Sequence, residues 1–273
     1  MLETVLVPLS LREGNTKIER MSAVLSALGA DELVLLHVHP GPLPGRRVQA
    51  LNARAAALHN QGYRCRAVLR SGSPALTVVK TSGEEHCGLI ALPWQRKSWI
   101  QRSLVGSVTK DIVRLSDIPV FVYKPTRSAS PTDTPLIMYA TDFRETDRFA
   151  LPYLKNLQPS GGELLLFHAG ERAPDPAAER RRIAQVQADL DRLAGECREA
   201  GHEARILSAV GRPRTAVVRN ARRNAVDVVV IGKTDTGGPF STVLGSTAEA
   251  VAYNARCSVL IVPKTRVPAG GVS

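Results

Sequence analysis

Short apolar runs alternate with amphipathic stretches along the whole chain. The first run, Thr4–Leu9, has the length and residue bias of a buried strand, and Lys17–Leu28 after it carries apolar residues at helical spacing. Because strands that alternate with helices form parallel sheets covered on both faces, this half is predicted to be an α/β domain. The alternation further predicts strands at Glu32–His39, Arg64–Leu69, Gly88–Leu92 and Val120–Tyr123, and helices at Arg47–Asn60, Pro74–Thr81 and Ser107–Leu115.

A linker separates this half from a second half with the same pattern. Thr126–Pro135 is rich in Ser, Thr and Pro and has no apolar periodicity. The predicted fold is therefore α/β, with two tandem doubly wound parallel-sheet domains that are Rossmann-like and have five strands each. In the second half we predict strands at Leu136–Thr141, Glu163–His168, Glu203–Ala209, Asp227–Ile231 and Cys257–Val262, and helices at Phe149–Leu157, Ala177–Ala200, Arg214–Arg223 and Thr247–Asn254.

Matched glycines indicate that the two halves are duplicates. Gly72 pairs with Gly211, and Gly106 pairs with Gly245, at one offset of 139 positions (211 minus 72) that needs no gap. Other positions upstream match at slightly smaller offsets, in the same order along the chain. A set of matches in this order is typical of an internal repeat.

The stretch around the last predicted helix carries the clearest candidate site. The apolar strand Asp227–Ile231 ends at Gly232, and Gly245-Ser246 opens the helix Thr247–Asn254. The first N–H groups of a helix have no partner within it, and the helix dipole places positive charge at the same end. Such a spot suits an anion, most simply a phosphate group.

The spacing Gly232-x2-Asp235-x9-Gly245-Ser246 resembles the nucleotide loop of the universal stress protein family, whose pattern is Gly, two residues, Gly, nine residues and Gly-Ser/Thr. The segment MYATDF (Met138–Phe143) is also similar to this family. The resemblance covers nearly the whole chain and implies two domains, at 1–125 and 135–265, with a linker at 126–134 and a tail at 266–273. It further implies that the two domains pack as a pseudo-dimer within one chain.

The resemblance also implies an adenine nucleotide site in the second domain. In the family, an Asp after the first strand reaches the nucleoside, backbone at the end of the second strand borders the adenine, and the glycine loop holds the ribose and phosphates. Asp235 replaces the middle glycine, so its charge is expected to weaken the binding of phosphate, with Lys233 offsetting part of the effect. Carried onto this sequence, the implied contacts to ATP are Ala140, Thr141, Asp142, Ala169, Gly232, Lys233, Gly245, Ser246 and Thr247.

The first half lacks the residues that distinguish this site. Ser10 stands where the second half has Asp142, and Pro93 and Arg96 stand at the two glycine positions of the loop. Proline has no N–H and a fixed φ, and arginine does not adopt a positive φ as freely as glycine does. We therefore expect a degenerate site in the first domain and ATP in the second domain only. Asp142, considered alone, is also a good candidate for a helix N-cap.

Composition adds few constraints. The 273 residues are 44% hydrophobic and carry a formal net charge of +11, which suits nucleic acid, membrane or nucleotide phosphate without choosing among them. No apolar run approaches the ~18–20 residues that cross a bilayer, so we expect a cytoplasmic protein with no membrane partner. The four cysteines form no CxxC pair, which favours buried reduced thiols over disulfides or a metal.

Two further motifs have simple structural interpretations. His37-x-His39 can chelate a metal from a strand, but no acidic or Cys cluster accompanies it, so a buried strand-end histidine is favoured. Arginine clusters on two predicted helices are most simply solvated faces. One loop interleaves aromatic and basic residues, which suits either nucleic acid, a partner, or an exposed loop anchored by one Trp. Its residues are Trp94, Arg96, Lys97, Trp99 and Arg102.

The predicted function is a stress-response regulatory protein that binds ATP and is not an enzyme. No Ser-His-Asp, paired-carboxylate or Walker arrangement provides a catalytic base or a metal site. The alternatives are a nucleotide-independent scaffold, which acts through protein contacts, and a slow ATP hydrolase. Expected partners are the two domains themselves, a second copy of the chain in a homodimer, and an unknown protein, with nucleic acid disfavoured.

Overall fold

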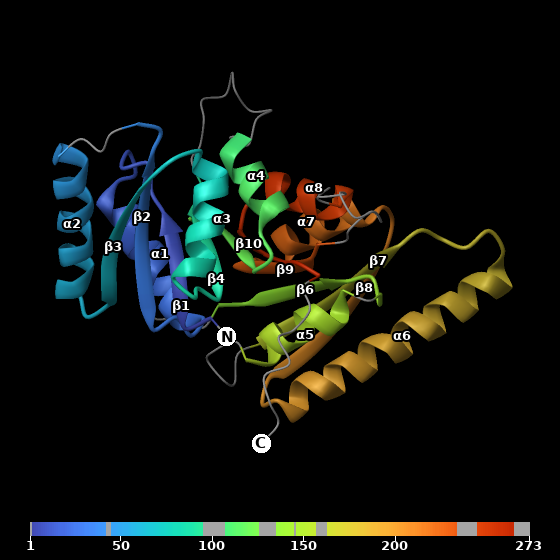
Figure 1. The fold of residues 1–273 in the computed structure, drawn as a ribbon. Helices are drawn as coiled ribbons and strands as arrows, with labels where there is room; N and C mark the ends of the chain where they lie inside the picture. The colour runs from blue at the N-terminus through green and yellow to red at the C-terminus, as the bar shows by residue number, and fades with distance from the viewer. Residues whose placement is uncertain are drawn as a thin grey trace. The chain divides into compact units, whose positions relative to one another are not determined.

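The computed structural model describes residues 2–41, 45–94, 107–125, 135–144, 146–156, 163–233 and 245–264, in two compact units, Met1–Thr134 and Pro135–Ser273 (Figure 1). Each unit is described by itself. The predictions that concern Asp235, Arg96, Lys97, Trp99 and Arg102 lie outside the described residues.

The described strands of the first unit form one parallel sheet. Their spatial order is β3-β2-β1-β4-β5. The strands β2 and β3 therefore lie on one side of β1, and β4 and β5 lie on the other side. The helices α3 and α4 pack against each other, as right-handed crossovers on one face of the sheet require. The strands are β1 Thr4–Pro8, β2 Glu32–His39, β3 Arg64–Ser71, β4 Leu89–Pro93 and β5 Val120–Tyr123, and the helices are α1 Asn15–Ala27, α2 Gly45–Asn60, α3 Pro74–Glu84 and α4 Ser107–Leu115.

The second unit repeats this arrangement. Its parallel strands have the order β8-β7-β6-β9-β10, and α7 packs against α8 as α3 does against α4. The strands are β6 Ile137–Thr141, β7 Glu163–Gly170, β8 Glu203–Val210, β9 Val228–Gly232 and β10 Ser258–Val262, and the helices are α5 Asp147–Lys155, α6 Pro176–Glu199, α7 Pro213–Arg223 and α8 Ser246–Asn254. The α/β fold of two tandem Rossmann-like domains is confirmed, whereas the packing of the domains as a pseudo-dimer stays a prediction.

Local chemistry explains where these elements begin. Proline stands in the first turn of α3, α6 and α7, where its missing N–H costs no helical hydrogen bond. The Asp175 carboxylate accepts a hydrogen bond from the N–H of Ala178 at 2.8 Å and so caps α6. The β-branched run Val228–Ile231 is buried on both faces, as expected for a central parallel strand.

Backbone conformation preserves the duplication. Leu11 and Phe143, which follow the first strand of each unit, have φ angles of 65° and 58°. Gly72 and Gly211, which precede α3 and α7, have φ angles of 140° and 134°. A positive φ is uncommon for residues other than glycine. Its recurrence at matched positions shows that the two units share backbone detail as well as topology.

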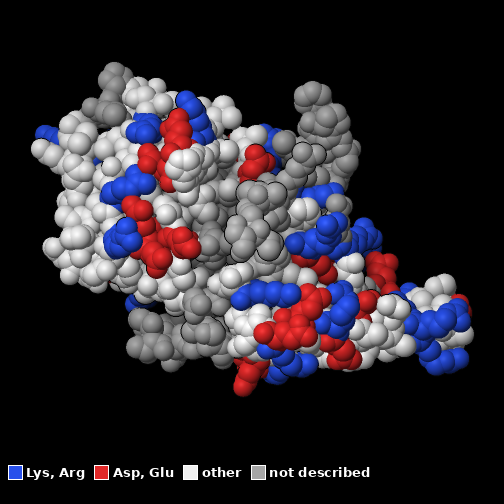
Figure 2. All heavy atoms as spheres, turned by 60° about the horizontal axis from the view of Figure 1, so that its bottom comes forward, with Lys and Arg blue, Asp and Glu red and all other residues white. Residues whose placement is uncertain are grey.

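The long helix α6 carries mixed charge on its exposed side. Blue and red spheres alternate along it at the lower right of Figure 2. Arg192 and Glu196 form an i,i+4 ion pair at 2.7 Å, and Arg182 pairs with Glu179 at 2.8 Å. No helix within the described residues is both long enough and apolar enough to span a bilayer.

The four cysteines are free thiols; Cys87, Cys197 and Cys257 are buried as predicted, whereas Cys65 is half-buried. Cys87 and Cys197 are buried, and burial raises the pKa of each to about 11. A thiol with such a pKa is almost entirely protonated at neutral pH and is a poor nucleophile. Cys87 and Cys197 therefore act as small apolar residues of the core.

Candidate functional site

The sheet topology selects one edge of each unit as a ligand site. The strand order reverses between β6 and β9 in the second unit, and between β1 and β4 in the first. Open α/β sheets bind ligands outside the carboxyl ends of the strands that flank such a reversal. In the second unit this location lies after Thr141 at the end of β6 and after Gly232 at the end of β9.

A buried hydrogen-bond network ties β6 to the start of α5. The Tyr139 hydroxyl donates to the Asp147 carboxylate at 2.5 Å, and the Thr141 hydroxyl lies 2.8 and 2.9 Å from the two carboxylate oxygens. The N–H of Phe143 in turn donates to the Thr141 hydroxyl at 2.9 Å. The side chain of Thr141, a predicted nucleotide contact, is therefore hydrogen-bonded within the protein.

Burial dominates the protonation of this network. It raises the pKa of Asp147, although the hydrogen bonds from Tyr139 and Thr141 act in the opposite direction by stabilising the carboxylate. Burial and the neighbouring Asp147 together raise the pKa of Tyr139 well above its ordinary value, so the phenol stays a donor. No local sequence pattern identifies Asp147 as a site residue, because its role depends on how α5 packs against β6.

Asp142 lies at the exposed end of β6, where it organises the turn into α5. Its Oδ1 accepts hydrogen bonds from the N–H of Arg144 at 3.1 Å and from the hydroxyl of Thr146 at 3.3 Å. Arg144 Nε lies 3.9 Å from Asp142 Oδ2, an ion pair with exposed side chains. Asp142 thus stabilises the turn that precedes α5, whereas the N-cap residue of this helix is Thr146, so the alternative prediction that Asp142 is the helix N-cap is wrong.

An aromatic pair forms the border between β6 and β7. The positive φ of Phe143 turns its ring onto His168, with centroids 4.5 Å apart and planes at 22°. His168 Nδ1 lies 3.0 Å from the carbonyl oxygen of Thr141. Burial, with a smaller contribution from Arg182, lowers the pKa of His168, so the ring is neutral at pH 7. Ala169, the predicted adenine neighbour, is the next residue of β7 and is buried.

Gly232 at the end of β9 has a packing role. A Cβ on this residue would stand 2.6 Å from the Cβ of Thr146, at the start of α5, which is closer than real side chains approach. The N–H of Lys233 donates to the carbonyl of Val262 at 2.7 Å, and the lysine side chain is buried. Glycine at this position is therefore needed for the close approach of α5, whether or not a nucleotide binds.

The N-terminus of α8 provides the candidate phosphate position. Gly245 is a buried N-cap residue whose carbonyl accepts from the N–H of Glu249 at 3.0 Å. Ser246 is exposed and Thr247 is half-buried, so the first turn of α8 is accessible from solvent. No side chain caps this helix within the described residues, and its first N–H groups have no helical acceptor.

Sequence comparison identifies the family to which these units belong. The sequence model of the Universal stress protein family matches twice, over residues 1–124 and over residues 136–263. The chain belongs to the universal stress protein family. A relative from Thermus aquaticus, named "Universal stress protein in QAH/OAS sulfhydrylase 3'region", is 35% identical over 115 residues, which cover 38% of this chain and 80% of that protein.

Solved structures of similar proteins share the tandem fold. A universal stress protein from Archaeoglobus fulgidus superposes with a TM-score of 0.69 over 96% of each chain at 20% identity. A protein of unknown function from Pseudomonas aeruginosa PAO1 superposes with a TM-score of 0.73, over 96% of this chain and 92% of that chain, at 18% identity. At these identities the likeness shows the fold alone.

The first universal stress domain has different chemistry at its matched edge. Ser10, at the position of Asp142, donates from both its N–H and its hydroxyl to Glu13 Oε1, at 3.0 and 2.7 Å. Glu13 is buried, and Arg54 Nη1 lies 3.5 Å from its other carboxylate oxygen. A second Arg54 nitrogen donates to the backbone carbonyls of Leu11 and Glu13. An internal ion pair therefore stands beside the end of β1.

A tryptophan stands at the end of β4 in the same domain. The Lys124 ammonium lies 4.5 Å from the centroid of the Trp94 ring, within cation–π range. The Lys17 ammonium donates to the Trp94 carbonyl, and burial lowers the pKa of Lys17. Trp94 corresponds to Lys233, so the two domains place very different side chains after the matched strands. The residues of the loop that follows Trp94 lie outside the described residues, so the interpretation of this loop stays a prediction.

His37 is a structural histidine of the first domain. It is buried, and its Nδ1 lies 2.8 Å from the carbonyl oxygen of Leu9, the contact that His168 makes with Thr141 in the second domain. Among the residues that the structure describes, no group of three or more His, Cys, Asp or Glu side chains is arranged to hold a metal. The buried strand-end role of His37 is confirmed.

Proposed function

We propose that this universal stress protein is a cytoplasmic regulator of the stress response that binds one adenine nucleotide, ATP, in its second domain alone. The proposed contacts are those implied by the family resemblance. They include the Asp142 carboxylate, backbone at Ala169 and Gly232, and the N-terminus of α8. Ala140, Thr141 and Lys233 belong to the same proposed set.

The observation that carries this proposal is the chemical difference between two matched edges. In the second domain β9 ends at Gly232, which has no side chain, whereas in the first domain β4 ends at Pro93 and is followed by Trp94, whose ring is covered by the Lys124 ammonium. After the first strand, the second domain has Asp142, whose exposed carboxylate lies 3.9 Å from Arg144 Nε, whereas the first domain has Ser10, which is hydrogen-bonded to a buried glutamate. The second domain therefore has both a residue without a side chain at the end of β9 and the exposed carboxylate of Asp142, which supports its assignment as the nucleotide-binding domain.

The role that we propose is binding without catalysis. Phosphoryl transfer to water needs a group that positions the nucleophile and charges that stabilise the transition state. Of the two carboxylates near the end of β6, Asp142 stabilises a turn and Asp147 lies within the Tyr139 and Thr141 network. Neither is arranged as a base for an attacking water, which favours a nucleotide-responsive binding protein over an ATP hydrolase.

A matched pair of variants tests the site. Gly245 precedes α8, and Gly106 holds the corresponding position before α4. Gly245→Val in the full chain is expected to raise the Kd for ATP by at least about tenfold, equivalent to about 1.4 kcal/mol, because the side chain crowds the N–H groups of the helix terminus. Gly106→Val is expected to leave the Kd unchanged. Equilibrium dialysis with radiolabelled ATP measures both.

The outcome separates the proposal from its rival. Loss of binding in Gly106→Val with retention in Gly245→Val would contradict the assignment to the second domain. Wild-type protein that binds no ATP, and releases no nucleotide when denatured after purification, would favour the nucleotide-independent scaffold. Circular dichroism of each variant confirms that the fold is intact before binding is compared.

A further inference from the structure

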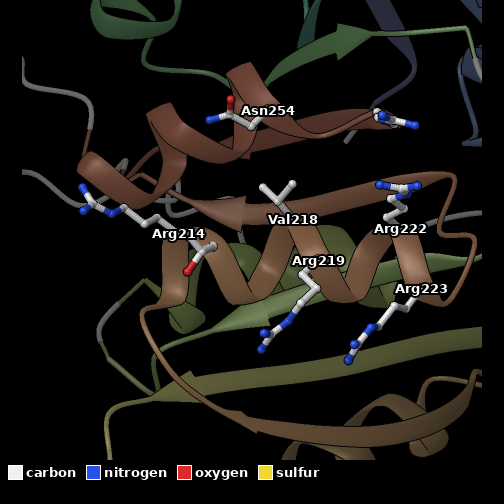
Figure 3. Close-up of a pocket in the computed structure, with 8 residues that line it drawn as sticks. Arg214, Val218, Arg219, Arg222, Arg223 and Asn254 are labelled. Carbon is white, nitrogen blue, oxygen red and sulfur yellow. The ribbon is translucent and has the colours of Figure 1, made fainter.

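Five arginines line a groove between α7 and the end of α8. Arg214, Arg219, Arg222 and Arg223 come from α7, and Arg256 follows α8, around a cavity of about 570 Å³. Figure 3 shows Arg219 and Arg223 leaving α7 side by side, with Val218 and Arg222 projecting from another side of the helix and Asn254 across from them on α8. The volume is in the range of small-molecule sites.

None of these five guanidinium groups has an ion pair or a hydrogen bond in the described structure. All five residues are exposed, and the lining contains no acidic residue. This contrasts with α6, where Arg182 and Arg192 are paired with Glu179 and Glu196. Unpaired like charges repel one another. An anion that binds in the groove neutralises these charges and so lowers the free energy of the protein.

The duplicated domain provides an internal comparison. It packs α3 against α4 in the same arrangement, but the matched positions, 139 residues earlier (214 minus 75), have a different charge. Where the second domain has five positive charges, the first has one lysine and two acidic residues, and Lys80 pairs with Glu84 at 3.4 Å. The counterparts of Arg214, Arg219, Arg222, Arg223 and Arg256 are Ala75, Lys80, Gly83, Glu84 and Asp117.

Helix stability does not account for this difference. Arg222 and Arg223 lie in the last turn of α7, where a positive charge is favourable beside the helix dipole. Yet α3 ends in the same way with Gly83 and Glu84 at these positions. The fold therefore forms without arginines at these positions. Arg256 lies outside a helix, so a favourable interaction with the α7 dipole does not explain its presence.

We infer that this groove binds a linear phosphate polyanion, of which inorganic polyphosphate is the simplest example. Arginine matches phosphate oxygens in bidentate geometry and stays charged at every relevant pH. From Arg214 to Arg223 the helix rises about 14 Å, so the positive charges are closely spaced along it. Such spacing suits a linear ligand that carries a negative charge on each of its phosphate units. The lining has no aromatic residue on which a nucleic acid base can stack.

The groove is separate from the proposed nucleotide site. The nucleotide is assigned to the N-terminus of α8 at Ser246, whereas the groove uses Asn254 at the other end of this nine-residue helix. The two ends are about 12 Å apart along the axis. Polyphosphate binding is therefore expected to persist in Gly245→Val.

A pair of double variants with equal change of charge tests the inference. Isothermal titration calorimetry of the full chain with inorganic polyphosphate of defined length is expected to show binding. The affinity is expected to fall steeply with added salt. Arg222→Ala with Arg223→Ala is expected to weaken it at least tenfold. Arg180→Ala with Arg181→Ala, on the exposed face of α6, is expected to change it less than twofold.

Each alternative outcome overturns the inference. Equal weakening in both double variants would mean that net charge alone attracts the polyanion. Absence of polyphosphate binding at low salt would contradict the site. A single-stranded oligonucleotide that binds as tightly as polyphosphate, and with the same sensitivity to the groove variant, would replace the proposed ligand with nucleic acid. Near-ultraviolet circular dichroism shows that each variant is folded.

Discussion

His168, beside the candidate site, is a residue whose protonation is controlled by burial. Its neutral ring stacks on Phe143 and donates from Nδ1 to the Thr141 carbonyl, and burial lowers its pKa from the ordinary 6.5. A group with a depressed folded-state pKa stabilises the fold above its unfolded pKa, and this contribution is lost as the pH falls towards the folded pKa. The unfolded chain then binds a proton that the folded protein excludes.

The expected result is a loss of unfolding free energy below about pH 6.5 that depends on this ring. Chemical denaturation of the wild type and of His168→Gln between pH 7.5 and 5 measures it. The wild-type curve should fall more steeply than that of the variant, which has no titrating group at this position. Parallel curves over the whole range would show that the lowered pKa of His168 has no effect on stability.

At the scale of single residues, the sequence predicts which residues lie at the ends of strands and helices better than it predicts what those residues contact. Asp142, Gly232 and Gly245 were singled out correctly as the residues at the strand and helix ends. The sequence could not reveal that Gly232 admits Thr146, or that Asp147 is buried under Tyr139. Both contacts depend on the exact approach of α5 to the sheet, which no local pattern specifies.

At the scale of elements, α5 is held by contacts with two strands. Thr146 at its start touches Gly232 of β9, and Asp147 is hydrogen-bonded to Tyr139 and Thr141 of β6. Any change in this approach also moves the turn at Asp142, whose carboxylate accepts from Thr146. The candidate site thus depends on the packing of α5 as much as on its own residues.

Gly232→Ala is expected to destabilise the protein by about 1–3 kcal/mol, because its Cβ overlaps that of Thr146. Gly195→Ala in α6 is the matched control: nothing lies within 4 Å of its Cβ. Alanine there is expected to stabilise the helix by about 0.5–1 kcal/mol. Urea denaturation compares the two variants.

A double variant identifies the contact that is responsible. Adding Thr146→Gly to Gly232→Ala should cost less than the sum of the two single changes, since the overlapping atom is removed. Strict additivity would show that the cost of Gly232→Ala comes from elsewhere, for example from the end of β9.

The order of helices and strands followed from hydrophobic periodicity, but their ends did not. The helix predicted at Phe149–Leu157 is observed as α5 at Asp147–Lys155, because the polar residue Asp147 is buried at its start. The strand predicted at Glu163–His168 continues to Gly170 as β7, paired with β8. Tertiary contacts that the local pattern cannot express set these ends.

At the scale of the whole molecule, a duplicated fold carries different side chains at matched positions. Matched positive φ angles and one strand order show how closely the two backbones agree. Their ligand edges differ, with Ser10 and Trp94 in one domain against Asp142 and Lys233 in the other. The groove between α7 and α8 differs in the same way from its counterpart between α3 and α4. At the groove the differing arginines are all exposed, and substitutions at exposed positions usually cost little stability.

The central claim is that only the second domain binds ATP, and the stoichiometry of the full chain tests it most directly. Isothermal titration calorimetry of the intact protein with ATP should give one site per chain. This follows because the first domain has Pro93 at the end of β4 and Trp94 directly after it, and a serine hydrogen-bonded to Glu13 after β1. A stoichiometry of two would contradict the asymmetry between the domains, and a titration with no binding heat at several temperatures would contradict nucleotide binding altogether.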